Sequence, residues 1–174
     1  ASCLVGSEMC IRDSDYLEAL SKMMKTEYDE ITKNDLLLQI DCPDLALARH
    51  MTFKNVSDEE FLVRAEKQIE CLNEAIKDID ASKLRMHICW GNYEGPHIHD
   101  IGLEKILPIA LKANIQTYLI EASNPRHAHE WQVFENIKLP NDKVIVPGVI
   151  DSTSNFIEHE ELVKNRIIQY SKVI

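Results

Sequence analysis

The sequence predicts an α/β protein whose strands form a parallel sheet. Three observations support this fold class: short apolar runs recur along the chain, helical patterns separate them, and polar residues stand at their ends. The runs are almost continuously apolar, which is typical of strands buried on both faces of a parallel sheet. They are LLLQIDC (residues 36–42), LRMHICW (84–90), TYLIEA (117–122) and KVIVPGVID (143–151).

Helical patterns fill the intervals between the runs. In the clearest one, residues 58–79, apolar residues recur at three-to-four spacing, as on the buried face of an amphipathic helix. Ser57 is placed to cap its N-terminus, and Glu60 completes a capping box. Further helices are expected at residues 103–113, 127–134 and 158–171.

Strand and helix alternate four times, which implies right-handed crossovers and either an open α/β sheet or a (β/α)₈ TIM barrel. In a barrel, catalytic groups lie at the carboxyl ends of the strands. A complete barrel takes about 250 residues, so the 174-residue chain is expected to be a partial barrel domain with about four βα units. The polar residues at the predicted strand ends are Asp41, Cys42, His87, Cys89, Glu121 and Asp151.

The first fourteen residues, ASCLVGSEMCIRDS, fit none of these elements. They resemble the translated, adapter-like leaders of fragments assembled from environmental DNA, although an ordinary flexible N-terminus is the alternative. We expect residues 1–14 to be a non-native leader and residues 15–174 to form the partial barrel domain.

The composition excludes several classes of partner. With 19 Lys and Arg against 29 Asp and Glu, the net charge of -10 argues against nucleic acid and anionic membranes. No apolar run is long enough to span a membrane, and no secretory signal is evident, so a cytoplasmic protein is expected. The five cysteines are irregularly spaced, which favours reduced thiols over a disulfide framework. Small-molecule substrates remain as partners.

His87-x-Cys89 is a candidate metal site at the end of a strand. Alternate residues of a strand point the same way, so both side chains can reach one ion. Imidazole and thiolate are favoured zinc ligands, and Glu121, ending the next strand, can supply the third, with the fourth position left for substrate. The alternative is that His87 and Cys89 are core residues of the strand, the commoner outcome for an isolated HxC.

Two other segments carry histidines. His97-x-His99-Asp100 suggests a metal-dependent hydrolase, but it follows Gly-Pro in a loop, where a hydrogen-bonding role in substrate binding is favoured. Arg126, in EASNPRHAHEW, can hold a carboxylate or sulfonate of a substrate. The neighbouring residues His127, His129 and Glu130 are expected to provide helix capping and surface charge.

Four segments, in order, resemble the C-terminal catalytic barrel of the cobalamin-independent methionine synthase family. They are LLLQIDCPDL, HICWGN, LIEAS and VPGVID. The resemblance covers roughly residues 35–174 and is closest to the single-barrel, methionine synthase II-like proteins. It implies zinc-dependent methyl or alkyl transfer to a thiol, as in 5-methyltetrahydropteroyltriglutamate-homocysteine S-methyltransferase of methionine biosynthesis.

The resemblance also implies roles for individual residues. His87, Cys89 and Glu121 take the positions of Zn²⁺ ligands, and Asp41 that of the aspartate holding the amino group of homocysteine. Asp151 takes a position on the side of the methyl donor. Zinc deprotonates a coordinated thiol, which then becomes a nucleophile at neutral pH.

Three departures from the family pattern keep the donor and the ligand set open. The last zinc ligand of the family is a cysteine on the next strand, which this sequence would reach only after Ile174. Cys42 replaces a glutamate of the family, and we expect it to be a packed residue. Ser152, Thr153 and Ser154 follow Asp151 where the synthases soon place a histidine that protonates the folate leaving group.

The methyl-tetrahydrofolate donor is therefore one possibility among several. The alternatives are thiol alkylation like that of epoxyalkane:coenzyme M transferases, a metal-dependent hydrolase using His97 and His99, and an inactive truncated domain whose exposed sheet edges promote association.

Overall fold

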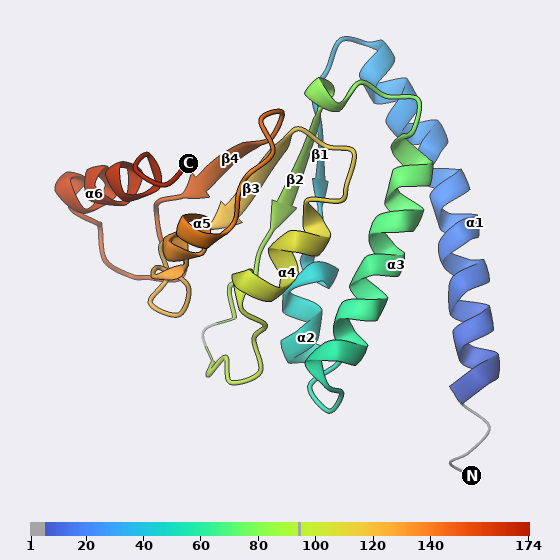
Figure 1. Ribbon diagram of the computed structural model, residues 1–174, viewed down its shortest axis with the longest axis horizontal. Coiled ribbons are helices and arrows are strands. Elements are labelled where there is room, and N and C mark those ends of the chain that lie inside the picture. The colour runs from blue at the N-terminus through green and yellow to red at the C-terminus, as the bar shows by residue number, and fades with distance from the viewer. Residues whose placement is uncertain (1–5, 94) are drawn as a thin grey trace.

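The computed structural model describes residues 6–93 and 95–174, with side chains from residue 15 onward. Its centre is a parallel sheet with the strand order β1-β2-β3-β4 (Figure 1). In register, Asp41 lies opposite His87, and Glu121 lies opposite Gly148. Parallel pairing places the carboxyl ends of all four strands at one edge of the sheet. The strands are β1 (Leu38–Asp41), β2 (Leu84–Ile88), β3 (Thr117–Glu121) and β4 (Val144–Gly148).

Helices cover one face of this sheet. Helices α3 and α4 pack on it, and α1 lies against α3, while α6 lies beyond β4 at the opposite end of the molecule (Figure 1). Short 3-10 turns occur at Pro43–Leu45, Ala81–Lys83 and Glu130–Gln132. The helices are α1 (Gly6–Lys33), α2 (Leu47–Met51), α3 (Asp58–Ile76), α4 (Leu103–Ala110), α5 (Val133–Asn136) and α6 (Glu160–Tyr170).

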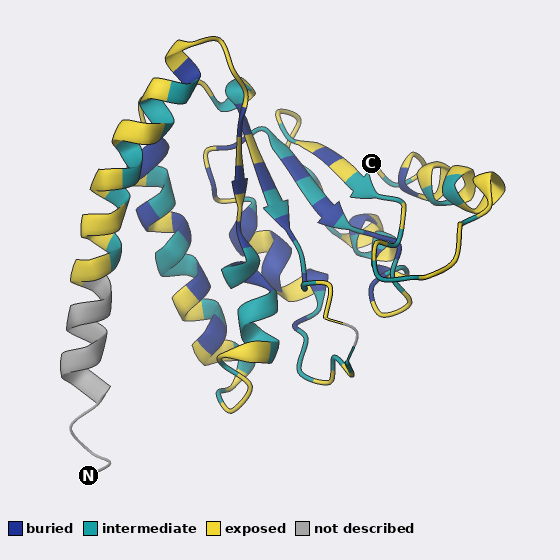
Figure 2. Ribbon diagram, turned by 180° about the vertical axis from the view of Figure 1, so that it is seen from behind, coloured by how far each residue is buried: buried dark blue, intermediate teal, exposed yellow. Residues whose placement is uncertain are grey.

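The strands are buried on one face only, which corrects the expectation that both faces are covered. Burial alternates along each strand: Leu38 and Ile40 of β1 lie in the core, whereas Gln39 and Asp41 between and after them are exposed. Figure 2 shows the sheet from its second side, with exposed residues on the strands. No described element covers this second face, so polar and charged side chains can project from it and stay in contact with solvent.

The alternating strand and helix order is confirmed, and all four strands fall inside the predicted runs. The α/β class with a parallel sheet is thus established. The described strands form an open sheet, and closure into a barrel remains a prediction.

Helix α1 was not expected. It begins at Gly6, so residues 6–14 belong to a helix rather than to a segment that fits no element. Residues 1–5 lie outside the described part of the chain, and a non-native origin of residues 1–14 stays a prediction. Across the described residues, no helix has both the length and the apolar composition that crossing a bilayer requires.

The helix expected at residues 127–134 is also wrong in its first half. Asn124 Oδ1 accepts the backbone N–H groups of Arg126 and His127, both at 2.9 Å, and this turn competes with helix formation. Regular helix begins only at Val133, after a 3-10 turn. The other predicted helices are present, each ending up to three residues earlier.

The capping box of α3 is confirmed. Ser57 Oγ accepts the Glu60 N–H at 3.2 Å, and the Glu60 carboxylate accepts the Ser57 N–H at 3.3 Å. We expect Ser57→Ala to lower the free energy of unfolding by about 1 kcal/mol, because one helix N–H then loses its acceptor. Urea unfolding checks this against Ser82→Ala, an exposed serine whose side chain caps no helix, which should change stability by less than about 0.5 kcal/mol. Equal stability of the two variants would contradict the role of the cap.

Candidate functional site

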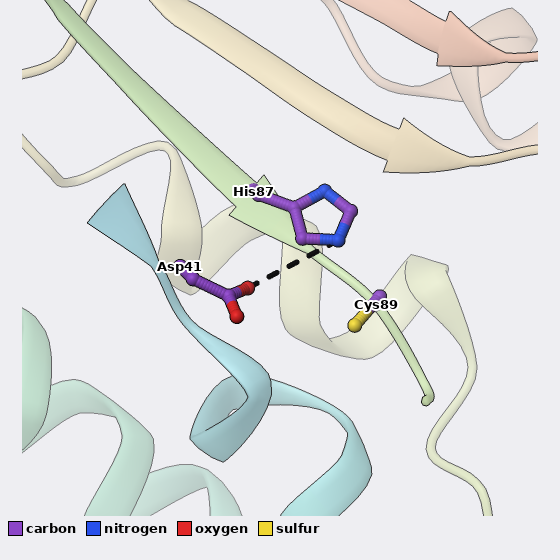
Figure 3. Close-up of side chains that lie close together, drawn as sticks. All are labelled: Asp41, His87 and Cys89. Atoms are coloured by element: carbon purple, nitrogen blue, oxygen red, sulfur yellow. Dashed lines mark ion pairs between the residues drawn. The ribbon is translucent and has the colours of Figure 1, made fainter. Parts of the chain in front are cut away.

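Asp41, His87 and Cys89 meet at the carboxyl ends of β1 and β2 (Figure 3). Asp41 Oδ1 lies 4.0 Å from His87 Nε2, and one potential ligand atom from each of the three residues lies within 4.8 Å of the other two. The Asp41 side chain is 67% exposed and that of His87 is 35% exposed. A nitrogen, a sulfur and a carboxylate oxygen are the donors that zinc accepts in proteins, so the three residues fit this ion.

The parallel register explains why these side chains gather. Asp41 and His87 are paired residues of neighbouring strands, and both project from the open face of the sheet. Cys89 follows two residues later, beyond the end of the strand. The adjacent Cys42 points the other way, into the hydrophobic core, where burial raises the pKa of its thiol. The expectation that Cys42 is a packed residue is confirmed.

The environment of Cys89 favours its neutral form. Burial raises the pKa of this thiol, the Gly91 N–H lowers it, and the negative charges of Asp41 and Glu121 raise it further. A divalent cation reverses this balance, because a coordinating thiol loses its proton. The protein therefore surrounds Cys89 with negative charge that a cation would compensate.

Glu121, the expected third ligand, lies at the end of β3 but does not join this group. Its Oε1 accepts three hydrogen bonds from the following loop: from Ser123 N at 2.7 Å, from Ser123 Oγ at 2.9 Å and from Asn124 N at 3.0 Å. Asp41 is instead the third residue of the group of nearby potential ligands. Glu121 is near enough to influence the Cys89 thiol electrostatically, and its role as a ligand stays a prediction.

Asp151 lies in the loop after β4, where its carboxylate organises the chain. Oδ1 accepts the Thr153 N–H at 2.9 Å and the Thr153 hydroxyl at 2.7 Å, while its own N–H donates to Glu158. The structure does not bring Asp151 into the group of Asp41, His87 and Cys89.

A second cluster surrounds Asp100, whose side chain is only 2% exposed. His97 Nδ1 and His127 Nε2 each lie 3.1 Å from its carboxylate oxygens. Arg126 Nε lies 3.8 Å from Oδ2, and His50 Nδ1, from helix α2, lies 3.8 Å from Oδ1. Four basic side chains from three segments thus converge on one carboxylate.

His127 and Glu130 are buried, which corrects the expectation of surface charge at these two residues. His127 Nδ1 lies 2.9 Å from Glu130 Oε2, so the imidazole lies between two carboxylates. Trp90 stacks on the same ring with centroids 4.0 Å apart and donates to the Ile101 carbonyl at 2.7 Å. His129, in contrast, is exposed as expected.

The charges in this cluster support each other. Burial raises the pKa of Asp100, but the hydrogen bonds from His127 and His97 outweigh it, so the net pKa is lowered. For His127, burial lowers the pKa, but the bonds to Asp100 and Glu130 outweigh it and the net pKa is raised. Both shifts favour a charged His127 beside a charged Asp100.

A cavity of about 350 Å³ opens between the loops that follow β2 and β3. Arg126, whose side chain is 51% exposed, lines this cavity, as the prediction of a substrate contact requires. Trp90, which directly follows Cys89 in the sequence, is one of its lining residues. Its other lining residues include Gly91, Tyr93, His97, Asp100, His127 and Thr153.

Sequence reasoning missed the contribution of His50, Trp90 and Glu130 to this region. His50 stands in no motif, since only the packing of α2 brings it to Asp100. The ring of His99 does not join the potential ligand group of His50, His97 and Asp100. The pairing of His97 with His99 in a hydrolase site thus has no support from the geometry.

Comparison of the chain with protein-family models, with curated protein sequences and with solved structures finds no match. The family expectation therefore rests on the sequence motifs and remains a proposal.

We expect His127→Gln to destabilise the protein by about 3 kcal/mol, because it leaves the buried carboxylates of Asp100 and Glu130 without the charge between them. Urea unfolding followed by circular dichroism measures the loss. His129→Gln is the matched control and should change stability by less than about 0.5 kcal/mol. A His127→Gln variant as stable as this control would show that the buried ion pairs do not stabilise the fold.

Proposed function

We propose that the chain belongs to a zinc-dependent thiol alkyltransferase resembling the cobalamin-independent methionine synthases, with a (β/α)₈ barrel as its complete fold. The observation that carries the proposal is the convergence of Asp41, His87 and Cys89 at the carboxyl ends of adjacent parallel strands, with Glu121 at the end of the next strand. Catalytic groups of a (β/α) barrel lie at this edge.

His87 and Cys89 would hold the zinc ion, and Glu121 would complete the protein ligands present here. When bound, zinc would activate the thiol of a homocysteine-like acceptor for attack on a methyl or alkyl group. The described hydrogen bonds from the loop all go to Glu121 Oε1. Oε2 is therefore left to coordinate the ion. A negative ligand set keeps a bound thiolate electron-rich.

Asp41 would orient the acceptor. Its carboxylate is the most exposed group of the three and accepts an ammonium group well, as the amino group of homocysteine requires. Arg126, at the rim of the cavity, would hold a carboxylate or sulfonate of a substrate in a bidentate contact. These two residues would give the substrate two charged contacts.

The contacts of Asp151, on the side of the alkyl donor, favour a second candidate function: alkyl transfer like that of the epoxyalkane:coenzyme M transferases. Asp151 Oδ1 already accepts two hydrogen bonds from Thr153, so it holds a loop rather than a histidine that protonates a folate nitrogen. An epoxide donor leaves an alkoxide on the product and needs no folate leaving group. Asp151 would act by fixing the loop beside the donor.

Metal binding tests the proposed centre. With Co²⁺ in place of zinc, we expect a thiolate-to-cobalt charge-transfer band that Cys89→Ser abolishes and His87→Ala weakens strongly, because both ligands are lost from one ion. Cys71→Ala is the matched control, since Cys71 lies in helix α3 away from the strand ends. A band that survives Cys89→Ser would exclude this site.

The roles of Glu121 and Asp41 separate in the same measurement. We expect Glu121→Gln to weaken metal affinity by at least about 10-fold, while Asp41→Asn retains the metal and raises KM for an amino-bearing thiol. Alkylation of homocysteine and of a thiol without an amino group, followed by mass spectrometry, gives the second readout. Loss of the metal with Asp41→Asn alone would make Asp41 the ligand instead.

A further inference from the structure

We infer that His50, His97 and Asp100 form a second binding site for a divalent metal ion, distinct from the centre at Cys89. One potential ligand atom from each lies within 4.8 Å of the other two. The three residues come from helix α2 and from the loop that follows β2. All three are partly buried, and the carboxylate of Asp100 is 2% exposed. Two imidazoles and one carboxylate are a recurrent set of metal ligands.

The hydrogen bonds of His97 hold its Nδ1 against the carboxylate of Asp100. Its Nε2 lies 2.8 Å from the carbonyl oxygen of Tyr93, which can only accept, so Nε2 carries the proton. A proton on Nδ1 as well would make the ring an imidazolium that donates to Asp100. Nδ1 lies 3.1 Å from both oxygens of Asp100, and a divalent cation can take the place of the proton between them.

His50 presents a second imidazole nitrogen to the same carboxylate. Its Nδ1 accepts the backbone N–H of His99 at 3.4 Å, so this nitrogen carries no proton. It lies 3.8 Å from Asp100 Oδ1. One ligand atom from each of the two imidazoles and from the carboxylate therefore lies close to the others, and the long contact to His99 is weak enough for a metal ion to replace it.

The carboxylate of Asp100 also contacts residues outside the proposed ligand set. Oδ1 lies near His50, His97 contacts both oxygens, and Oδ2 also lies 3.1 Å from His127 Nε2 and 3.8 Å from Arg126 Nε. Carboxylates that bind metal ions are commonly oriented by hydrogen bonds of this kind from outside the ligand set. Tyr93 plays the same part for His97 by fixing its tautomer.

Metal binding requires a small rotation of one ring. The imidazoles of His50 and His97 are nearly parallel, with an angle of 14° between them and centroids 4.8 Å apart, whereas an ion lies in the plane of each ring that binds it. The outer torsion of histidine has a broad energy minimum, so turning one ring out of the stack costs little.

The donor atoms indicate the class of ion. A set of two nitrogens and one oxygen, without sulfur, suits Zn²⁺, Fe²⁺, Mn²⁺ or Co²⁺, and three protein ligands leave positions for water or substrate. His97 and Asp100 also line the 350 Å³ cavity, together with Arg126. A ligand in the cavity can therefore reach the open positions of the ion and the guanidinium.

Titration of the metal-free, full-length chain with Co²⁺ tests the inference. We expect two equivalents to bind: one with the thiolate-to-cobalt band and one with d–d bands only. His50→Ala and His97→Ala should each weaken the second equivalent by about 100-fold or more while leaving the thiolate band unchanged. His129→Ala, an exposed histidine nearby, is the control and should retain both equivalents.

Circular dichroism and thermal unfolding show whether each variant is folded, and a conservative His50→Gln provides a second test if His50→Ala is not. A second equivalent that persists in folded His50 and His97 variants overturns the inference, as does a wild type that binds only the thiolate-linked ion. A wild type that lacks the thiolate band but binds an ion lost in His50→Ala supports this site and refutes the centre at Cys89.

Discussion

Asp41 pairs with His87 across the parallel strands β1 and β2, and the positions of the other candidate groups depend on this register. The same alignment brings Glu121 to the end of β3 and places Cys89 one step beyond the edge of the sheet. Helices α3 and α4 pack on the covered face, so the groups on the other face remain accessible. A one-residue shift of either strand would turn its polar end into the core and the apolar residues outward.

Around this edge, charged contacts hold the loops in addition to the burial of Trp90 and Ile101. Asp100 lies among four basic side chains, while Arg166 donates to the carbonyl groups of Val149 and Ser123 and pairs with Glu158. These contacts join the loops after β2, β3 and β4 to neighbouring elements. Polar networks of this kind specify one arrangement, because every buried charge that loses its partner is costly.

Local signals in the sequence were sufficient to predict the strands and helix α3 with its capping box. They also predicted the adjacency of His87 and Cys89, which follows from the two-residue period of a strand. Contacts between distant segments carry no such signal. His50 meets Asp100 only through the packing of α2, and the turn at Asn124 overrides a helical pattern that looked sufficient. Apolar composition also failed to show that one face of the sheet is open, because Leu119 and Val146 look like core residues wherever they stand.

The side chain of Glu130 links two parts of the molecule that the sequence keeps apart. Helix α4 begins after Gly102, which has no side chain to cap it, and Glu130 Oε1 accepts the Leu103 N–H at 2.8 Å in its place. The other oxygen of the same carboxylate holds His127 at the wall of the cavity. A change in the cavity that displaces His127 therefore also loosens the start of a helix beneath the sheet. Protection of the α4 amides against hydrogen exchange would report on cavity occupancy from a distance.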